Sequence, residues 1–215
     1  MTMVQSDLLK GRRVVVTGAA GALGAAVVDA LAVAGADVLA PRRAELDLGD
    51  EAAVAAFYAR LPDLWASVQV AGGFAAAPFL DTSLADFRGQ LDMNLTTCFL
   101  CCREAVRRMS AGGRIINVAS RAAVSPAGGS VAYTVSKAGV TALTQALADE
   151  VKGRRILVNA VLPSIIDTPA NRAAMPNARH DLWPKPAAIA AAIVWLASPA
   201  NQLVSGALLP VYGEA

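Results

Sequence analysis

The segment that most constrains the fold of this chain is a β-branched run that leads directly into a glycine-rich turn. Residues 12–17 read Arg-Arg-Val-Val-Val-Thr, and Gly18, Gly21 and Gly24 follow at once. An apolar helical pattern and a second strand-like run at 37–40 complete a βαβ unit. Glycines let the backbone approach a phosphate, and a helix N-terminus presents free N–H groups. The segment therefore favours a dinucleotide site, and a glycine-rich turn that binds no ligand is the alternative.

The same alternation of strand-like and helical segments continues to the end of the chain. We expect one doubly wound (Rossmann) α/β domain over residues 1–215, with about seven parallel strands and helices on both faces of the sheet. The proline-rich stretch 164–185 reads as a loop long enough to act as a substrate lid. The expected strands are 12–17, 37–40, 45–48, 66–70, 114–118, 156–162 and 206–211, and the long expected helices are 84–110 and 130–151.

Composition excludes several classes of function. Hydrophobic residues make up 55% of the chain and charged residues 17%, which suits a sheet buried on both faces. The net charge of +2 gives no electrostatic case for binding nucleic acid or a membrane surface. No apolar run reaches the roughly 18 residues of a membrane span, and residues 1–7 do not resemble a signal peptide. We expect a cytoplasmic protein, because three cysteines crowded into one short segment suit a reducing compartment.

Three side chains near the middle of the chain can act on one polarised oxygen. Tyr133 and Lys137 are four residues apart, so they share one face of the helix expected at 130–151. Ser120 follows the strand-like run 114–118, and ligands of open α/β sheets bind beyond the carboxyl ends of strands. A phenol, an ammonium and a hydroxyl are therefore expected to converge there.

Two further positions suggest how a cofactor is selected and approached. Dinucleotide sites that take NAD usually carry an acidic residue after the second strand, and here Pro41 is followed by Arg42 and Arg43. Arginine suits a 2′-phosphate, which favours NADP, although NAD stays open and an ordinary solvated loop is the alternative. Ala71 and Gly72 follow the expected strand 66–70 and again allow backbone to approach a ligand.

The three cysteines do not indicate a metal site. Cys98, Cys101 and Cys102 crowd one helical segment, and the only histidine, His180, lies far along the chain. A structural metal would need further ligands at suitable spacing. We expect no metal, no disulfide and three buried thiols.

The ordered set of motifs resembles the short-chain dehydrogenase/reductase family over nearly the whole chain. Residues 17–24 resemble the family's Thr-Gly-x-x-x-Gly-x-Gly loop, and Tyr133 to Lys137 matches its Tyr-x-x-x-Lys signature. Ser120 has the spacing of the family's catalytic serine, thirteen residues before the tyrosine, and Asn94 falls on its helix asparagine. Residues 159–169 resemble the motif that follows the sixth strand.

Three positions depart from the family pattern. Ala22 stands at the middle glycine, Gln69-Val70 replaces a usual Asn-Asn pair, and Ser164 replaces a glycine. The segment 162–176 also resembles the dihydropteridine reductase branch. That branch typically lacks the serine and prefers NADH, whereas Ser120 and the two arginines point away from it.

The resemblance implies a role for each site residue. Tyr133 would exchange the proton, Lys137 would lower the pKa of that phenol and hold the nicotinamide ribose, and Ser120 would bind the substrate oxygen. Asn94 would position a water that links Lys137 to solvent. The implied cofactor contacts are Gly18, Gly21, Leu23, Gly24, Arg42, Arg43, Asp47, Leu48, Ala71, Gly72, Lys137, Ile166 and Thr168.

The implied activity is hydride transfer between NADPH and a small carbonyl or alcohol substrate. A 3-oxoacyl-carrier reductase or a pteridine reductase is an alternative within the same chemistry, with Phe74, Phe79 and Trp183 as candidate pocket aromatics. A protein that senses the cofactor without turnover is the alternative of another class. The resemblance also implies a homodimer or homotetramer.

Overall fold

One parallel sheet forms the centre of the computed structural model, which describes residues 7–214. Residues 1–6, on which the expectation about a signal peptide depends, lie outside the described part. The strand order is β2-β1-β3-β4-β5-β6, so the chain reverses its direction of travel across the sheet at β1 and β3. This confirms the doubly wound fold class. The strands are β1 (Arg13–Thr17), β2 (Asp37–Leu39), β3 (Ala66–Gln69), β4 (Gly113–Val118), β5 (Ile156–Pro163) and β6 (Leu208–Val211).

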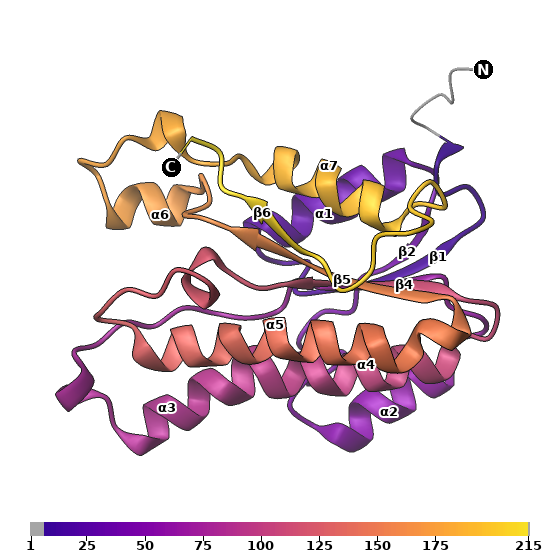
Figure 1. Cartoon of the computed structure of the whole chain (residues 1–215), viewed down its shortest axis with the longest axis horizontal. Helices are drawn as coiled ribbons and strands as arrows, with labels where there is room; N and C mark the ends of the chain where they lie inside the picture. The colour runs from indigo at the N-terminus through magenta and orange to yellow at the C-terminus, as the bar shows by residue number, and fades with distance from the viewer. Residues whose placement is uncertain (1–6, 215) are drawn as a thin grey trace.

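Helices cover both faces of the sheet (Figure 1). On one face lie α1 (Ala22–Val33) and α7 (Pro186–Ala197), which pack against each other. On the other face lie α2 (Glu51–Ala59), α4 (Thr97–Arg108) and α5 (Val131–Val151). A short helix α3 (Leu84–Leu91) runs into a π-helical turn, η3 (Asp92–Thr96), and then into α4. Among the described helices, none is both long and apolar enough to cross a membrane.

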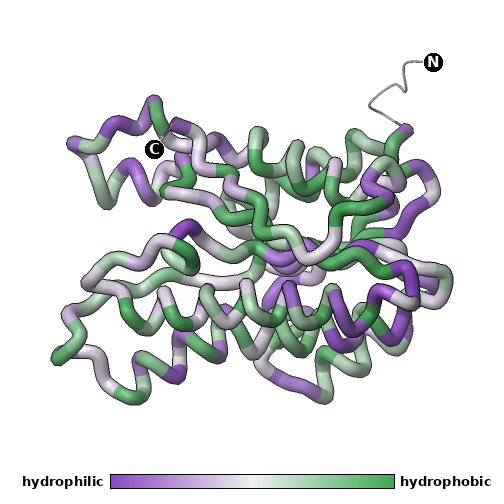
Figure 2. Tube along the Cα trace, in the orientation of Figure 1, coloured by the Kyte–Doolittle hydropathy of each residue, from purple (hydrophilic) through white to green (hydrophobic). Residues whose placement is uncertain are grey.

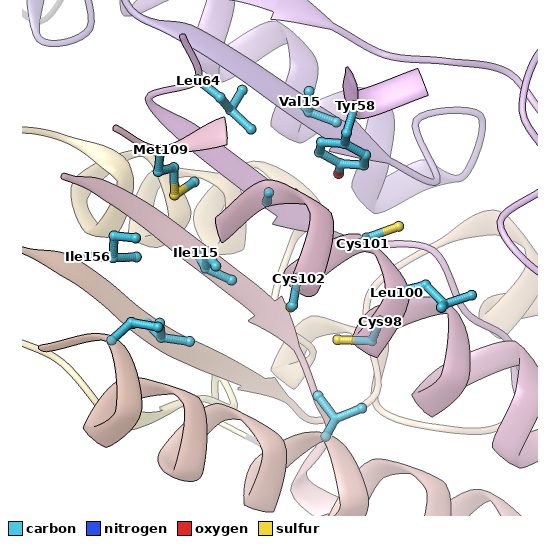
Figure 3. Packing of buried hydrophobic residues seen from close by; sticks show 14 of the residues in the cluster. Val15, Tyr58, Leu64, Cys98, Leu100, Cys101, Cys102, Met109, Ile115 and Ile156 are labelled. Carbon is cyan, nitrogen blue, oxygen red and sulfur yellow. The ribbon is translucent and has the colours of Figure 1, made fainter. Parts of the chain in front are cut away.

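The hydrophobic core has two parts because successive strand residues point to opposite faces of the sheet. Val14 and Val16 of β1 pack with α1 and α7, whose residues are mostly hydrophobic (Figure 2). Val15 packs on the other side with α2 and α4, around Tyr58 and the cysteines (Figure 3). All three cysteines are buried free thiols, as the sequence predicted.

The strand expected at 45–48 does not form, so within residues 7–214 the sheet has six strands. The backbone N–H groups of Glu45 and Leu46 both donate to the carbonyl of Arg42, which folds the chain into a turn. The Leu46 side chain is buried in the core, so its hydrophobicity reflects packing beneath the sheet edge. The apolar alternation that indicated a strand there belongs to an anchored turn.

The stretch 164–185 contains more regular structure than its prolines indicated. Helix α6 (Pro169–Ala174) begins with Pro169 at its first position, where a missing N–H costs nothing. The Thr168 hydroxyl caps this helix by accepting a hydrogen bond from the N–H of Asn171 at 3.2 Å. A 3₁₀ turn, His180–Leu182, follows.

Candidate functional site

Five of the sequence-predicted site residues follow the carboxyl ends of parallel strands. Gly18 follows β1, Arg42 follows β2, Ala71 follows β3, Ser120 follows β4 and Ile166 follows β5. Parallel strands end at the same edge of a sheet, so these positions share one edge of the molecule. The point where strand order reverses lies between β1 and β3, and the glycine turn sits there.

The glycine turn is packed so closely that two of its glycines have no room for a side chain. Gly18 has a φ of 74°, and a Cβ there would lie 2.5 Å from the backbone nitrogen of Ala71. A Cβ on Gly24 would overlap the carbonyl oxygen of Gly18. Gly21 caps the start of α1 and has more space, since its nearest neighbour would lie at 3.6 Å. The turn thus brings the N-terminus of α1 against the end of β3.

Leu23, an expected cofactor contact, lies in the first turn of α1. Its side chain is buried in the core cluster that also contains residues of α7. Helix N-terminal N–H groups are the part of such a turn that binds phosphate.

Gln69 supports the end of β3 through hydrogen bonds that sequence reasoning did not identify. The Thr17 hydroxyl donates to its Oε1 at 3.2 Å, and its Nε2 donates to the Ser67 hydroxyl at 2.8 Å. The Ala71 N–H in turn donates to the Thr17 hydroxyl at 3.4 Å. A buried amide in this strand therefore ties β1 to β3 just before the backbone reaches Gly72.

Asn94 holds the segment that follows β3. It lies in the π-helical turn, is 1% exposed, and its Oδ1 accepts a hydrogen bond from the Gly73 N–H at 3.0 Å. Its Nδ2 donates to the Gly73 carbonyl at 3.0 Å and to the Gln90 carbonyl at 3.2 Å. Asn94 thus hydrogen-bonds to the peptide groups on both sides of Gly73.

Gly72 sits where three candidate residues meet. A Cβ on Gly72 would lie 2.5 Å from Asn94 Oδ1 and 3.3 Å from Lys137 Nζ. The space that a side chain would take is filled by Asn94 and Lys137, so the Gly72 backbone lies directly against both side chains. A glycine here lets the end of β3 approach these two residues closely.

Ser120 lies close to Tyr133, near enough for its hydroxyl to lower the pKa of the phenol by hydrogen bonding. Ser120 begins a 3₁₀ turn after β4, where its hydroxyl also accepts from the Ala122 N–H at 3.2 Å. Tyr133 lies in the first turn of α5. Burial raises the pKa of the Tyr133 phenol, and the hydrogen bond with Ser120 acts in the opposite direction.

Lys137 lies one turn further along α5 and is 5% exposed. Its Nζ donates to the Val118 carbonyl at 2.9 Å, at the last residue of β4. Burial lowers the pKa of Lys137 to about 8, and the neighbouring Cys98 acts in the opposite direction. Sequence reasoning predicted the lysine but missed its carbonyl partner, because no local pattern marks it.

These pKa directions differ from the expected effect of Lys137 on Tyr133. The sequence led us to expect a phenol pKa below its usual value near 10. In the protein alone, the pKa of Tyr133 is raised because burial disfavours the phenolate, and Ser120 is the group that counteracts this. Desolvation also lowers the pKa of Lys137, so the residue that was expected to stabilise the phenolate carries its positive charge less readily.

Arg42 is held by Glu45 in the turn after β2. The Arg42 Nη2 and Nε donate to Glu45 Oε1 at 2.9 and 3.2 Å, and the Arg42 backbone N–H donates to Oε2 at 2.9 Å. The Arg42 side chain is 79% exposed, so its fork is reachable by a ligand. The Glu45 carboxylate offsets the positive charge of this exposed guanidinium. The sequence pattern alone did not reveal this ion pair.

The remaining expected contacts lie in the connection that follows β2 and in the connection that follows β5. Arg43 is exposed, Asp47 Oδ1 accepts from the Gly49 N–H at 2.9 Å, and Leu48 packs against the core. After β5, the Ile166 carbonyl accepts from Asn171 Nδ2 at 2.8 Å. Across residues 7–214, the structure has no group of three or more His, Cys, Asp or Glu placed to hold a metal ion.

Phe74 lies against Tyr133, which the sequence did not determine. The two ring centroids are 4.9 Å apart and the rings are nearly perpendicular, at 81°. Trp183, another candidate pocket aromatic, is buried instead and contacts the ring of His180 at 4.6 Å. Phe79 is 69% exposed in a 3₁₀ turn, η2 (Phe79–Asp81).

Known proteins match this chain over nearly its whole length. A family model described as enoyl-(acyl carrier protein) reductase matches residues 5–213. The chain is 34% identical to D-threitol dehydrogenase of Mycolicibacterium smegmatis over 244 aligned positions, covering 95% of this chain and 93% of the relative. It is also 34% identical to 3beta-hydroxysteroid dehydrogenase 1 of Eggerthella lenta, over 250 aligned positions and with 96% and 94% coverage. Those alignments exceed this chain's 215 residues, so the relatives carry segments that it lacks.

Solved structures also resemble this chain over nearly its whole length. A putative gluconate dehydrogenase from Agrobacterium tumefaciens superposes with a TM-score of 0.90 at 29% identity, covering 97% of each chain. A dehydrogenase/reductase from Sinorhizobium meliloti gives 0.86 at 29% identity, covering 98% of this chain and 97% of the other. The chain therefore belongs to the short-chain dehydrogenase/reductase family, whose members are nicotinamide-dependent oxidoreductases acting on alcohol and carbonyl groups.

Proposed function

We propose that this chain interconverts a small ketone and its secondary alcohol with NADP as cofactor and Tyr133 as the acid and base. One observation carries the proposal. The Tyr133 phenol lies beside the Ser120 hydroxyl and one turn of α5 before Lys137, whose Nζ is fixed to the Val118 carbonyl at 2.9 Å. Two hydroxyl groups that meet in this way can both reach one substrate oxygen.

The proton and the developing charge are handled by side chains of this chain. In the reductive direction the Ser120 hydroxyl donates a hydrogen bond to the substrate oxygen, and Tyr133 delivers a proton to it. This transfer leaves Tyr133 as a phenolate. Lys137, fixed to the Val118 carbonyl, stabilises that phenolate when the lysine amine is protonated. The bound nicotinamide supplies the hydride. Asn94 keeps the neighbouring backbone in place and positions a water that leads protons from Lys137 to solvent.

The residues present fit a dinucleotide. Gly72 adds no side chain of its own beside Asn94 and Lys137, and Gly18 packs against the backbone of Ala71, so backbone lies at the switch point. Arg42 and Arg43 would bind the 2′-phosphate, with Asp47 and Leu48 beside the adenine, and Ile166 and Thr168 beside the carboxamide. NAD remains the alternative cofactor, because Glu45 already engages the Arg42 fork.

The assembly and the lid are part of the same proposal. Exposed apolar side chains on η3, α4 and α5 support pairing of two copies through these helices, and multi-angle light scattering would measure the resulting mass. The exposed apolar side chains that support this pairing are Met93, Phe99 and Val135, which are 46%, 44% and 42% exposed.

We infer that residues 164–185, with α6, close over substrate, and that the three free thiols suit a cytoplasmic location.

The proposed function is tested by mixing the protein with NADPH and a panel of carbonyl compounds and following absorbance of the reduced nicotinamide. We expect oxidation of NADPH with at least one ketone. Tight binding of NADPH without turnover of any carbonyl would favour the cofactor-sensing alternative. Turnover confined to acyl-carrier thioesters or to pterins would instead favour those reductases.

A further inference from the structure

We propose that Phe74 determines substrate specificity, and that the site takes ketones and secondary alcohols with a nonpolar ring or alkyl group beside the reacting carbon. The inference rests on the proposed function of Tyr133. It concerns which molecule is placed against that phenol.

The first observation is the contact between the two rings. Phe74 meets Tyr133 edge to face with centroids 4.9 Å apart, so the Phe74 ring borders the phenol that would transfer the proton. Yet Phe74 is 66% exposed. Most of its ring is therefore available to a second molecule, at the position where a substrate would approach Tyr133.

The second observation is that the backbone carrying Phe74 is fixed. Asn94 binds the N–H and the carbonyl of Gly73, the residue directly before Phe74. A Cβ on Gly73 would overlap Met93 Sδ, which shows how closely this segment lies on the π-helical turn. An exposed aromatic side chain on an anchored backbone can act as a defined wall of a site, because little of its position has to be ordered on binding.

The chemistry of such a wall decides the substrate class. A phenyl ring offers dispersion and apolar contact but no partner for a hydroxyl, so a polyol hydroxyl placed there would lose water without replacement. A cyclohexyl or alkyl group would gain from the same contact. The relatives are named for a polyol and for a steroid, so family membership alone does not decide between these classes.

The experiment compares two ketones of opposite character in three proteins. The ratio of kcat/KM for cyclohexanone to kcat/KM for dihydroxyacetone is measured with NADPH in the wild type, Phe74→Ala and Phe79→Ala. Phe79, although a candidate pocket aromatic from the sequence, is the matched control because it is an equally exposed phenylalanine in the same connection, 69% exposed, and its ring does not contact Tyr133 as that of Phe74 does. A ratio of two substrates is independent of the fraction of protein that is folded, so a merely structural role of Phe74 would not change it.

We expect the wild type to favour cyclohexanone, and Phe74→Ala to lower the ratio by about tenfold, while Phe79→Ala leaves it within about twofold. Phe74→Leu, which keeps an apolar group, should retain most of the preference. A wild type that favours dihydroxyacetone, or equal ratios in all three proteins, would overturn the inference and leave the proposed function intact. Reduction of neither ketone, nor of any other carbonyl, would overturn both.

Discussion

The Nζ of Lys137 donates a hydrogen bond to the Val118 carbonyl oxygen across 2.9 Å, which ties α5 to the last residue of β4. This contact fixes an ammonium group in a place where it is 5% exposed. A single neutral carbonyl does not offset the loss of water around a charge, which is why burial lowers the pKa of Lys137 to about 8.

The lowered pKa of Lys137 predicts a stability that rises with pH. Between about pH 8 and the usual lysine pKa near 10.4, the unfolded chain holds a proton that the folded chain has released, so alkaline pH favours the folded state. Below that window both states are protonated and the burial cost is fully present. From about pH 7.5 to about pH 9.5, the unfolding free energy of the wild type should rise by about 2 kcal/mol relative to Lys137→Met, measured by urea denaturation. Lys152→Met, at a side chain that is 72% exposed, is the control.

The hydrogen bonds of Asn94 predict a structural cost on its removal. In Asn94→Ala the N–H and carbonyl of Gly73 both lose their partners, which should lower the unfolding free energy by about 2 kcal/mol. Asn177→Ala changes the same residue type at an exposed position and should stay within about 0.5 kcal/mol of the wild type. An Asn94→Ala protein as stable as the control would show that the grip on Gly73 contributes little.

The three glycines of the first turn should differ in their tolerance of alanine. Gly24→Ala would force a Cβ into the Gly18 carbonyl, and Gly18→Ala would both strain a φ of 74° and press on Ala71. Each should lower stability by about 1–3 kcal/mol and weaken NADPH binding. Gly21→Ala meets its nearest neighbour only at 3.6 Å and should be well tolerated. Thermal melts with and without NADPH would measure both effects, and equal losses in all three variants would contradict this packing.

The sequence predicted most of the fold because local patterns and the final architecture agree. The β1 run is apolar on both sides, and Val14 and Val15 do pack on opposite faces of the sheet. The strand expected at 45–48 was wrong because a buried Leu46 looks the same in a strand and in an anchored turn. The relatives also carry segments that this chain lacks, so a strand that belongs to the family pattern need not form here.

The candidate site was predictable where spacing carries the chemistry and less so where contacts are distant in sequence. The four-residue step from Tyr133 to Lys137 is one helical turn, so the spacing alone places both residues on one face of α5. Phe74 against Tyr133, and Glu45 on Arg42, depend on how connections fold back, which no periodicity encodes. The pKa of Tyr133 depends on burial, which a short motif does not report.

The ion pair between Arg42 and Glu45 predicts a cofactor preference that can be changed in either direction. Arg42→Gln should weaken NADPH binding about tenfold and leave NADH nearly unchanged, because only NADPH carries the 2′-phosphate. Glu45→Gln should tighten NADPH binding severalfold, since it removes a negative charge next to that phosphate and frees the Arg42 fork. Titrations that follow nicotinamide fluorescence give both affinities. Arg42→Gln with unchanged NADPH affinity would reject this role.

The central claim, that Tyr133 exchanges the proton, is tested most directly by turnover and cofactor binding of Tyr133→Phe. Tyr58→Phe is the matched control, because it removes another phenol hydroxyl, bound to the Ser67 hydroxyl at 2.9 Å in the core. For Tyr133→Phe we expect kcat to fall about a thousandfold while NADPH affinity stays within about twofold. For Tyr58→Phe we expect nearly full kcat with a lower melting temperature. A Tyr133→Phe enzyme that keeps the kcat of the wild type would contradict the account.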